Sequence, residues 1–181
     1  MERSKHPYWR FMDQTEFEQY IDQYGGDILS FCHYLTKNHD EAEDLCQDCF
    51  VQGFRSRNTI TGSDHVKPFL LSVAIRLWQN RKRKFAWRKR ICESKKISLY
   101  GSETIDCNPS EQTLLKEKDS IVREAVARLD EKKRIVVLLF YKEELKDKEI
   151  AEILHIPVGT VKSRLNLAKK ELAAIIEEYE K

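Results

Sequence analysis

The residues most suited to chemistry lie between Arg76 and Arg90 (RLWQNRKRKFAWRKR), where eight cations and three aromatic side chains fall within fifteen residues. Cations neutralise phosphates and release counterions, and the rings of Trp78, Phe85 and Trp87 can stack on unpaired bases. The run therefore predicts contact with single-stranded or opening DNA. A solvated charge run in which Trp78 and Phe85 only cover the core is the alternative, and the run alone does not separate the two.

A second candidate for DNA contact is the stretch from Asp147 to Leu172 (DKEIAEILHIPVGTVKSRLNLAKKEL). Apolar residues at helical spacing predict two helices that pack on each other around a tight turn at residues 155–157, and the small Ala151 allows a close approach. Such a helix-turn-helix can place the outward face of its second helix in a major groove. That face carries Gly159, Thr160, Lys162, Ser163, Asn166, Lys169 and Lys170.

Side-chain type predicts roles on this face. Thr160 and the backbone N–H groups near Gly159 suit a phosphate at the positive end of a helix. Lys162, Ser163 and Asn166 suit base edges, where a good pair contributes about 1–3 kcal/mol of discrimination, and the later lysines suit the DNA backbone. An amphipathic helix of an ordinary bundle is the weaker alternative, because turn, small residue and basic face all agree.

Five cysteines include one pair, Cys46 and Cys49, with the C-x-x-C spacing of a metal or redox motif. Read as a helix, the stretch puts both thiols in an apolar stripe with Leu45 and Phe50. Because free cysteine behaves as a small buried hydrophobe, core packing is favoured over metal or redox chemistry. No second C-x-x-C pair completes a zinc site, and the odd count favours reduced thiols.

Composition favours a helix-rich protein of two small domains, since the 181 residues are 41% hydrophobic and 34% charged with only 6 Gly and 4 Pro. The net charge is +2, but residues 40–48 hold five acidic and no basic side chains, whereas residues 65–92 hold nine basic and no acidic ones. Opposed blocks suggest one face for nucleic acid and another for a basic protein. The longest apolar run, residues 135–141, is too short to span a bilayer and the N-terminus lacks a secretory pattern, so we expect a cytoplasmic protein.

Helices are needed to position these residues. Apolar periodicity predicts a first helix that ends at Gly25-Gly26 and a second at residues 27–36. A third is expected to begin with Asp40 as N-cap and Glu43 in a capping box, and a fourth is expected to open near Pro68. These four helices make one compact domain.

The expected fold class is all-α, with two small helical domains. The first is placed at residues 13–90. Turn-forming and polar residues predict a flexible linker at 91–115, and helical periodicity resumes in a second domain at 116–178.

Three stretches resemble the extracytoplasmic-function (ECF) group of bacterial RNA polymerase sigma factors. DEAEDLCQDCFVQGFR, residues 40–55, resembles the region-two helix that docks on the polymerase clamp. KPFLLSVAIRLWQNRKRK, residues 67–84, resembles the promoter-melting helix. EIAEILHIPVGTVKSRLNLAKKEL, residues 149–172, resembles the helix-turn-helix of region four. The resemblance covers nearly the whole chain, and three motifs in this order are specific.

The resemblance implies a protein that binds core RNA polymerase at its clamp and flap and directs initiation at specific promoters, with no catalysis and no cofactor of its own. The clamp is implied to meet Asp44, Gln47 and Asp48. The minus-ten element is implied to be bound and melted by Phe69, Arg76, Trp78, Asn80, Arg81 and Arg83, with a flipped base held by the loop at 56–66. The minus-thirty-five element is implied to be read by Thr160, Lys162, Ser163, Arg164, Asn166, Lys169 and Lys170. An anti-sigma factor, often membrane-bound, is a further implied partner.

Some positions depart from the family pattern. Phe69 stands where a Trp is common, which keeps a ring but loses the indole N–H. Lys146 stands where a Ser or Thr often caps the helix before the motif, and Asp147 is expected to substitute. Asn166 and Leu167 stand where an aromatic and a basic residue are frequent, so the promoter preference should differ from that of better-known members.

Two other classes of protein compete with this interpretation. A stand-alone helix-turn-helix regulator would bind duplex DNA tightly without polymerase, but it has no use for the helix at 40–55 beside a melting helix. An enzyme acting on nucleic acid is disfavoured. The sequence has no phosphate-binding G-x-x-x-x-G-K loop, no metal-ligand spacing among its 5 His residues, and no nucleophile beside a plausible base.

Overall fold

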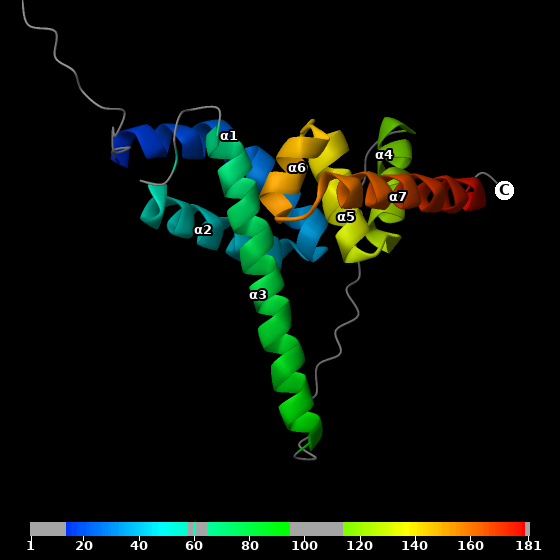
Figure 1. Ribbon diagram of the computed structural model, residues 1–181, viewed down its shortest axis with the longest axis horizontal. Coiled ribbons are helices and arrows are strands. Elements are labelled where there is room, and N and C mark those ends of the chain that lie inside the picture. Colours follow the sequence, from blue (N-terminus) through cyan, green and yellow to red (C-terminus); the bar gives the residue numbers. More distant parts are fainter. Residues whose placement is uncertain (1–13, 58–59, 61–64, 95–113, 180–181) are drawn as a thin grey trace, which may run out of the picture.

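The computed structural model describes residues 14–57, 60, 65–94 and 114–179, and every regular element in these ranges is a helix (Figure 1). In chain order the elements are α1 (Gln14–Thr36), α2 (His39–Arg55), α3 (Val66–Ser94), α4 (Leu114–Arg128), α5 (Glu131–Val137), the π-helical turn η3 (Leu138–Lys142), α6 (Asp147–Leu154) and α7 (Val158–Tyr179). The all-α fold class is confirmed. None of the helices in these ranges is both long enough and apolar enough to cross a membrane.

The helix break expected at Gly25-Gly26 is wrong, because α1 runs through it as one helix of 23 residues. A glycine costs about 1 kcal/mol in a helix interior. However, Phe17 before the pair and Ile28 and Phe31 after it are buried, and each such side chain contributes about 1.5–3 kcal/mol. Packing therefore outweighs the local preference, and the described part of the first half has three helices instead of the expected four.

The start of α2 also differs from the expectation. Its N-cap is Asn38 and not Asp40, and the Asn38 side chain accepts a hydrogen bond from the Glu41 N–H at 3.0 Å. In the preceding turn Lys37 takes a left-handed conformation with φ 62°, and the Thr36 hydroxyl donates to the Asn38 carbonyl at 2.9 Å. This tight turn folds α2 back onto α1.

Gly53 allows the three helices of the first half to close on one another. A Cβ atom at this position would lie 2.8 Å from Leu70 Cδ2 and 3.2 Å from Phe17 Cζ. Both of those side chains are fully buried, and the Phe17 ring packs edge-on against Phe54 with centroids 5.5 Å apart. The glycine is thus required by close approach of α1 and α3.

The short helices of the second half have defined caps. Asp130 begins α5 by accepting a hydrogen bond from the Lys132 N–H at 3.2 Å. At the start of α6 the expected substitution by Asp147 is wrong, since the Glu149 carboxylate accepts from the Lys146 N–H at 2.7 Å. The expected packing of α6 on α7 is confirmed by their buried residues, which are Ile150, Ala151, Val161, Leu165 and Ala168.

The two halves pack against each other. Helix α6 lies beside α3 (Figure 1), and buried residues from both halves form one continuous core. Polar contacts add to it: Lys82 of α3 pairs with Glu131 of α5, and the Lys37 ammonium donates to the Ala127 carbonyl of α4. The two halves therefore pack into one body around a common core, which we call the closed body.

The boundary expected at residue 90 lies inside a helix, because α3 continues to Ser94. The basic run and the first residues of the expected linker are one continuous element. Residues 95–113 of that linker lie outside the described residues, whereas its last two residues, 114 and 115, belong to α4. Most of the loop at 56–66, to which a flipped base was assigned, also lies outside the described residues.

Candidate nucleic-acid interface

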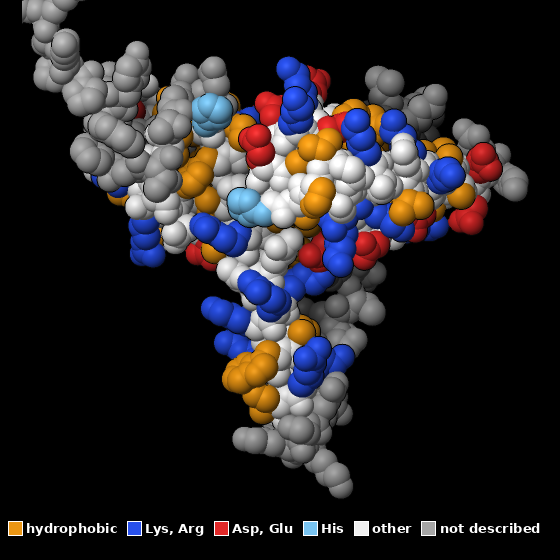
Figure 2. All heavy atoms as spheres, viewed as in Figure 1, with side chains coloured by type: hydrophobic (Ala, Val, Ile, Leu, Met, Phe, Trp, Pro, Cys, Tyr) orange, Lys and Arg blue, Asp and Glu red, His pale blue; other side chains and the backbone are white. Residues whose placement is uncertain are grey.

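The distal part of α3 projects from the body of the molecule (Figure 1). All side chains from Lys82 to Arg90 are exposed, and Figure 2 shows basic side chains with hydrophobic ones among them on the face in view. A helix that is exposed on all sides and strongly basic suits a phosphate backbone.

The three aromatic residues of the basic run differ in how far their side chains are exposed. Trp78 packs against the core; its Nε1 atom is buried without a hydrogen-bond partner among the described residues, and the Lys82 ammonium lies 5.8 Å from its ring centroid. Phe85 and Trp87 are 66% and 64% exposed. Core covering is therefore wrong for Phe85 but agrees with the packing of Trp78. The role of Trp78 at the minus-ten element stays a prediction.

Arg81 connects the basic helix to the acidic face of α2. Its Nη2 atom lies 2.5 Å from Asp48 Oδ2 and donates to the Asp44 carbonyl at 3.1 Å. Asp44, Gln47 and Asp48 are all exposed on α2. The surface predicted for polymerase and the surface predicted for DNA thus meet at one ion pair.

Arg76, Asn80 and Arg83 follow i, i+4, i+7 spacing on α3, so they share one face of the helix. Arg76 and Arg83 are exposed, and Arg83 Nη2 donates to Asn80 Oδ1. Phe69, the remaining residue predicted for the minus-ten element, is half-buried against the core. The structure therefore aligns Arg76, Asn80 and Arg83, pairs Arg81 with α2, and keeps the ring of Phe69 partly covered.

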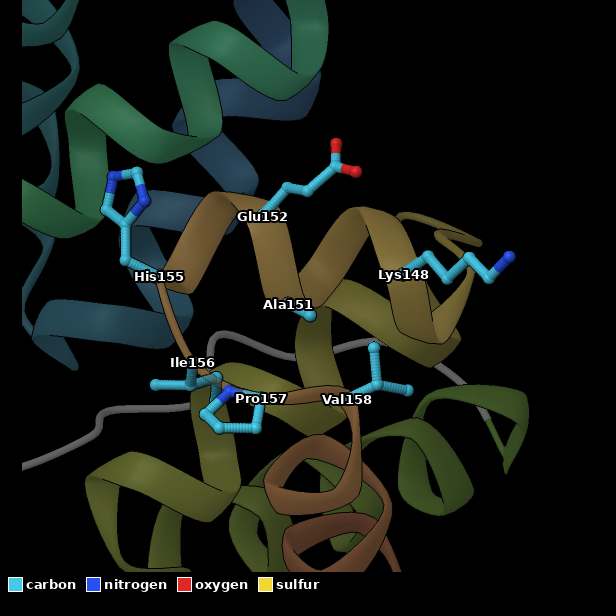
Figure 3. A pocket seen from close by; sticks show the side chains of 7 residues that line it. All are labelled: Lys148, Ala151, Glu152, His155, Ile156, Pro157 and Val158. Atoms are coloured by element: carbon cyan, nitrogen blue, oxygen red, sulfur yellow. The ribbon is translucent and has the colours of Figure 1, made fainter.

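The tight turn of the helix-turn-helix is confirmed. His155 ends α6 in the left-handed conformation, with φ 52°, and the Ile156 N–H closes the turn on the Ala151 carbonyl at 3.0 Å. The turn leaves an open groove of about 490 Å³. Ala151 of α6 and Val158 at the start of α7 both line it (Figure 3). Lys148 and Glu152 extend outward from α6.

Most of the predicted outward face of α7 is exposed: Gly159, Lys162, Ser163, Asn166, Lys169 and Lys170. Two details differ from the expectation. The Thr160 N–H donates to the Pro157 carbonyl at 2.9 Å, so it is not a free donor for a phosphate. The Ser163 hydroxyl donates to the Gly159 carbonyl at 2.9 Å, which leaves its lone pairs to accept from a base.

Two predicted DNA contacts are engaged within the protein. Arg164 is half-buried, and together with Gln79 of α3 it lines a cavity of about 160 Å³ between the halves. The Lys169 ammonium lies 5.7 Å from the Tyr141 ring centroid and 6.0 Å from that of Phe140. In this arrangement Arg164 is turned toward α3 and away from the outward face of α7.

Sequence reasoning missed the residues that join the two halves. Lys67 of α3 pairs with Glu143, whose side chain is only 2% exposed. No periodicity or motif marks this pair, because the partners come from elements far apart in the chain. The only available signal was general, namely that a buried charge needs a partner.

Comparison with known protein families supports the family resemblance that the sequence motifs indicate. The model for sigma-70 region 2 matches residues 20–88, and the model for sigma-70 region 4 matches residues 119–172. The ECF RNA polymerase sigma factor SigW of Bacillus subtilis (strain 168) is 28% identical over 165 residues, which are 88% of each chain. The chain belongs to the ECF sigma factors. As a sigma factor it directs promoter-specific transcription, and the stand-alone regulator is not favoured.

Other relatives of this sigma factor agree. The ECF sigma factor SigM of the same Bacillus strain is 28% identical over 160 residues, covering 87% of this chain and 93% of the relative. The fold matches the sigma factor RpoE in a complex with the anti-sigma factor NepR from Bartonella quintana, with a TM-score of 0.71 and 21% identity over 90% of this chain and 98% of that one. It also matches CnrH in a complex with the cytosolic domain of CnrY, with a TM-score of 0.64 and 17% identity over 92% of this chain and 90% of that one.

Proposed function

We propose that this sigma factor docks on the polymerase clamp through Asp44, Gln47 and Asp48, melts the minus-ten element with α3 and reads the minus-thirty-five element with α7. The contact between Arg81 and Asp48 is the observation that carries this proposal. It fixes the acidic face of α2 against the basic helix α3. Docking of the first surface on polymerase therefore orients the second toward DNA.

The docking face suits a basic partner. The carboxylates of Asp44 and Asp48 are exposed and lie one helical turn apart, and Gln47 beside them adds amide donors and acceptors. Such a face gains from charge complementarity with a basic surface, which speeds association and sets orientation.

Promoter binding requires the closed body to open. The minus-ten and minus-thirty-five elements lie roughly 25 base pairs apart, or about 85 Å at ~3.4 Å per base pair. Gln79 of α3 and Arg164 of α7 line the same cavity, so α3 and α7 cannot reach both elements in this arrangement. We expect α6 and α7 to leave α3 when the promoter is bound, which frees Arg164 for DNA.

An anti-sigma factor is a proposed partner in the cytoplasm. One structural neighbour, RpoE, is a sigma factor in a complex with the anti-sigma factor NepR, and a second, CnrH, is in a complex with the cytosolic domain of CnrY. Both α3 and α7 are needed to bind the promoter. A partner that covers both helices would keep them in the closed arrangement and away from the promoter. The family is not typically enzymatic, and we propose that this member acts by binding alone.

The docking proposal is tested by a change of charge on α2. Asp48→Asn should weaken binding to core polymerase roughly tenfold, because it removes one complementary charge at about 1.4 kcal/mol. Asp22→Asn, on the exposed side of α1, is the matched control and should bind like the unaltered chain. Fluorescence anisotropy of labelled protein titrated with core polymerase measures both. Equal affinities for the two variants would show that this face does not dock.

A further inference from the structure

The cavity between the two halves of the closed body has a volume of about 160 Å³. Its lining comes from four helices and from the turn of the helix-turn-helix. The lining residues are Gln79 of α3, Lys132 and Ile135 of α5, Leu154 of α6, Ile156 of the turn and Arg164 of α7. Such a volume holds about five water molecules at ~30 Å³ each. The cavity therefore suits a small ion and is too small for a nucleoside.

The polar part of this lining is basic. Arg164 and Lys132 each bring one positive charge, Gln79 brings an amide group, and no carboxylate lines the cavity. Glu131, the neighbour of Lys132 in the chain, is paired with Lys82 of α3. An anion that enters the cavity therefore meets two positive charges and an amide donor.

The two cations lack partners of their own within the ranges that the structure describes. The Arg164 guanidinium is half-buried there without an ion pair or a hydrogen bond, and the Lys132 ammonium likewise has neither. Partial burial of an unpaired charge is costly, and two like charges that line one small cavity also repel each other. Both costs fall when an anion lies between them.

We propose that this cavity binds a phosphate group, either as inorganic phosphate or at the end of a small metabolite. The planar guanidinium of Arg164 can donate two N–H groups to two phosphate oxygens. The Lys132 ammonium and the Gln79 amide can donate to the remaining oxygens. Donors from three helices approach from different directions, which suits a tetrahedral ion better than a planar carboxylate.

The apolar wall and the polar rim of the cavity both suit this ligand. Ile135 is buried, and Leu154 and Ile156 are half-buried. Beside such a wall the attraction between charges is screened less than in open water. Gln79 and Lys132 are exposed, so a small ion can enter from the solvent.

A bound phosphate joins the two halves. Gln79 belongs to the first half, whereas Lys132 and Arg164 belong to the second, so all three donors meet only in the closed body. A ligand that binds one arrangement better stabilises it by mass action. Phosphate should therefore oppose the opening that frees Arg164 for DNA. This consequence rests on the proposed function, whereas phosphate binding itself does not.

Nuclear magnetic resonance of the isotope-labelled full chain tests the site. Inorganic phosphate is titrated at constant ionic strength, with chloride withdrawn as phosphate is added. The Arg164 Nε–H signal is assigned by its loss in Arg164→Gln. We expect this signal and the Ile156 amide signal to shift and saturate, with a dissociation constant on the order of 1 mM, which a few charge-assisted hydrogen bonds can reach. A parallel titration with glycerol phosphate shows whether the free ion or an esterified group binds more tightly.

Variants separate this site from general attraction to a basic protein. Arg164→Gln and Lys132→Gln should each weaken binding roughly tenfold, measured at the Ile156 amide. Arg123→Gln, on the exposed side of α4, removes the same charge away from the cavity and should bind phosphate like the unaltered chain.

Three results would each overturn the proposal. They are shifts that grow without saturation, equal affinities for the Arg164→Gln and Arg123→Gln variants, and acetate bound as tightly as phosphate. The last result would indicate a carboxylate of a protein partner in place of a phosphate group. No polymerase or promoter is present in this experiment, so its failure would leave the proposed function standing.

Discussion

The Lys67 ammonium lies 2.9 Å from the buried carboxylate of Glu143 and 2.6 Å from the exposed carboxylate of Asp27. It therefore joins the start of α3 both to the second half of the chain and to α1. Glu143 Oε2 is buried and lacks a well-aligned hydrogen bond, so the charge of Lys67, and not a directed bond, compensates its burial.

Removal of this charge should destabilise the closed body. We expect Lys67→Met to lower the free energy of unfolding by about 2 kcal/mol, since it leaves a buried carboxylate unpaired. The double variant Lys67→Met with Glu143→Leu should recover much of the loss. Urea unfolding at pH 7 measures both. If Lys67→Met unfolds at the same urea concentration as the unaltered chain, the pair does not hold the halves together.

The contribution of Lys67 should also depend on pH. Burial acts to lower its pKa, but the hydrogen bond to Asp27 and the negative charges of Glu143 and Asp27 outweigh this and raise the pKa above the ordinary 10.5. The folded state then binds the proton more tightly than the unfolded state. Stabilisation is complete below pH 10.5 and is lost as the pH rises through the raised pKa. The difference in stability between Lys67→Met and the unaltered chain should shrink in that alkaline range.

His33 should make the protein sensitive to acid. Burial, and then the neighbouring His39 at a ring-centroid distance of 4.9 Å, lower the pKa of His33 below 6.5. The unfolded state therefore binds this proton more readily, and stability falls as the pH drops from about 6.5 through the lowered value. Urea unfolding at several acidic pH values should show a shallower fall for His33→Gln, and an intermediate one for His39→Gln. An identical slope in all three proteins would rule this origin out.

Two glycines of the first half should respond in opposite ways to alanine. Gly26 has open space where a Cβ would sit, so Gly26→Ala should stabilise the protein by about 0.5–1 kcal/mol through helix propensity. Gly53→Ala should destabilise it by about 1 kcal/mol or more, because the new methyl overlaps the buried Leu70 and Phe17 side chains. Thermal unfolding compares the two. A higher melting temperature for Gly53→Ala would contradict the packing described around that residue.

Residues of α7 should fall into two groups, those that contact the DNA backbone and those that contact base edges. With polymerase and a promoter duplex, Lys170→Ala should reduce the slope of log affinity against log salt by about 0.9, as expected for one lost phosphate contact. Asn166→Ala should keep that slope and lose about 1–3 kcal/mol of discrimination at one base pair. Binding titrations at several salt concentrations measure the slope, and a set of single-base promoter variants measures the discrimination. If the two substitutions change the same quantity, the assignment of roles is wrong.

Sequence patterns predicted the elements whose signals are local. The helix-turn-helix was predictable because apolar spacing, the small Ala151 and the turn before Pro157 all lie within one short stretch. The basic helix was equally visible, since the charge run continues over several turns. Local preference misled at Gly25-Gly26, where burial of residues on both sides keeps the helix intact, and at the start of α2, where Asn38 caps in place of Asp40.

Relations between distant segments were not predictable. The turn of Arg164 toward Gln79, the pairing of Lys67 with Glu143 and the hydrogen bond from Cys49 to the Leu70 carbonyl each depend on how helices pack. The expectation that Cys46 and Cys49 pack in the core is confirmed, since both are buried, but the hydrogen bond from Cys49 to the Leu70 carbonyl of α3 left no trace in the spacing. Pattern thus located the functional helices, while packing decided which side chains on them are available.

In vitro transcription with start-site mapping tests the central claim most directly. Core RNA polymerase is supplied with fragmented genomic DNA, with and without the purified chain, and the new 5′ ends are sequenced. The account predicts discrete starts that appear only with the chain and that share sequence elements near minus ten and minus thirty-five. It also predicts that a protein altered at both Asp44 and Asp48 loses these starts. Polymerase that initiates at the same sites with and without the chain would contradict the account.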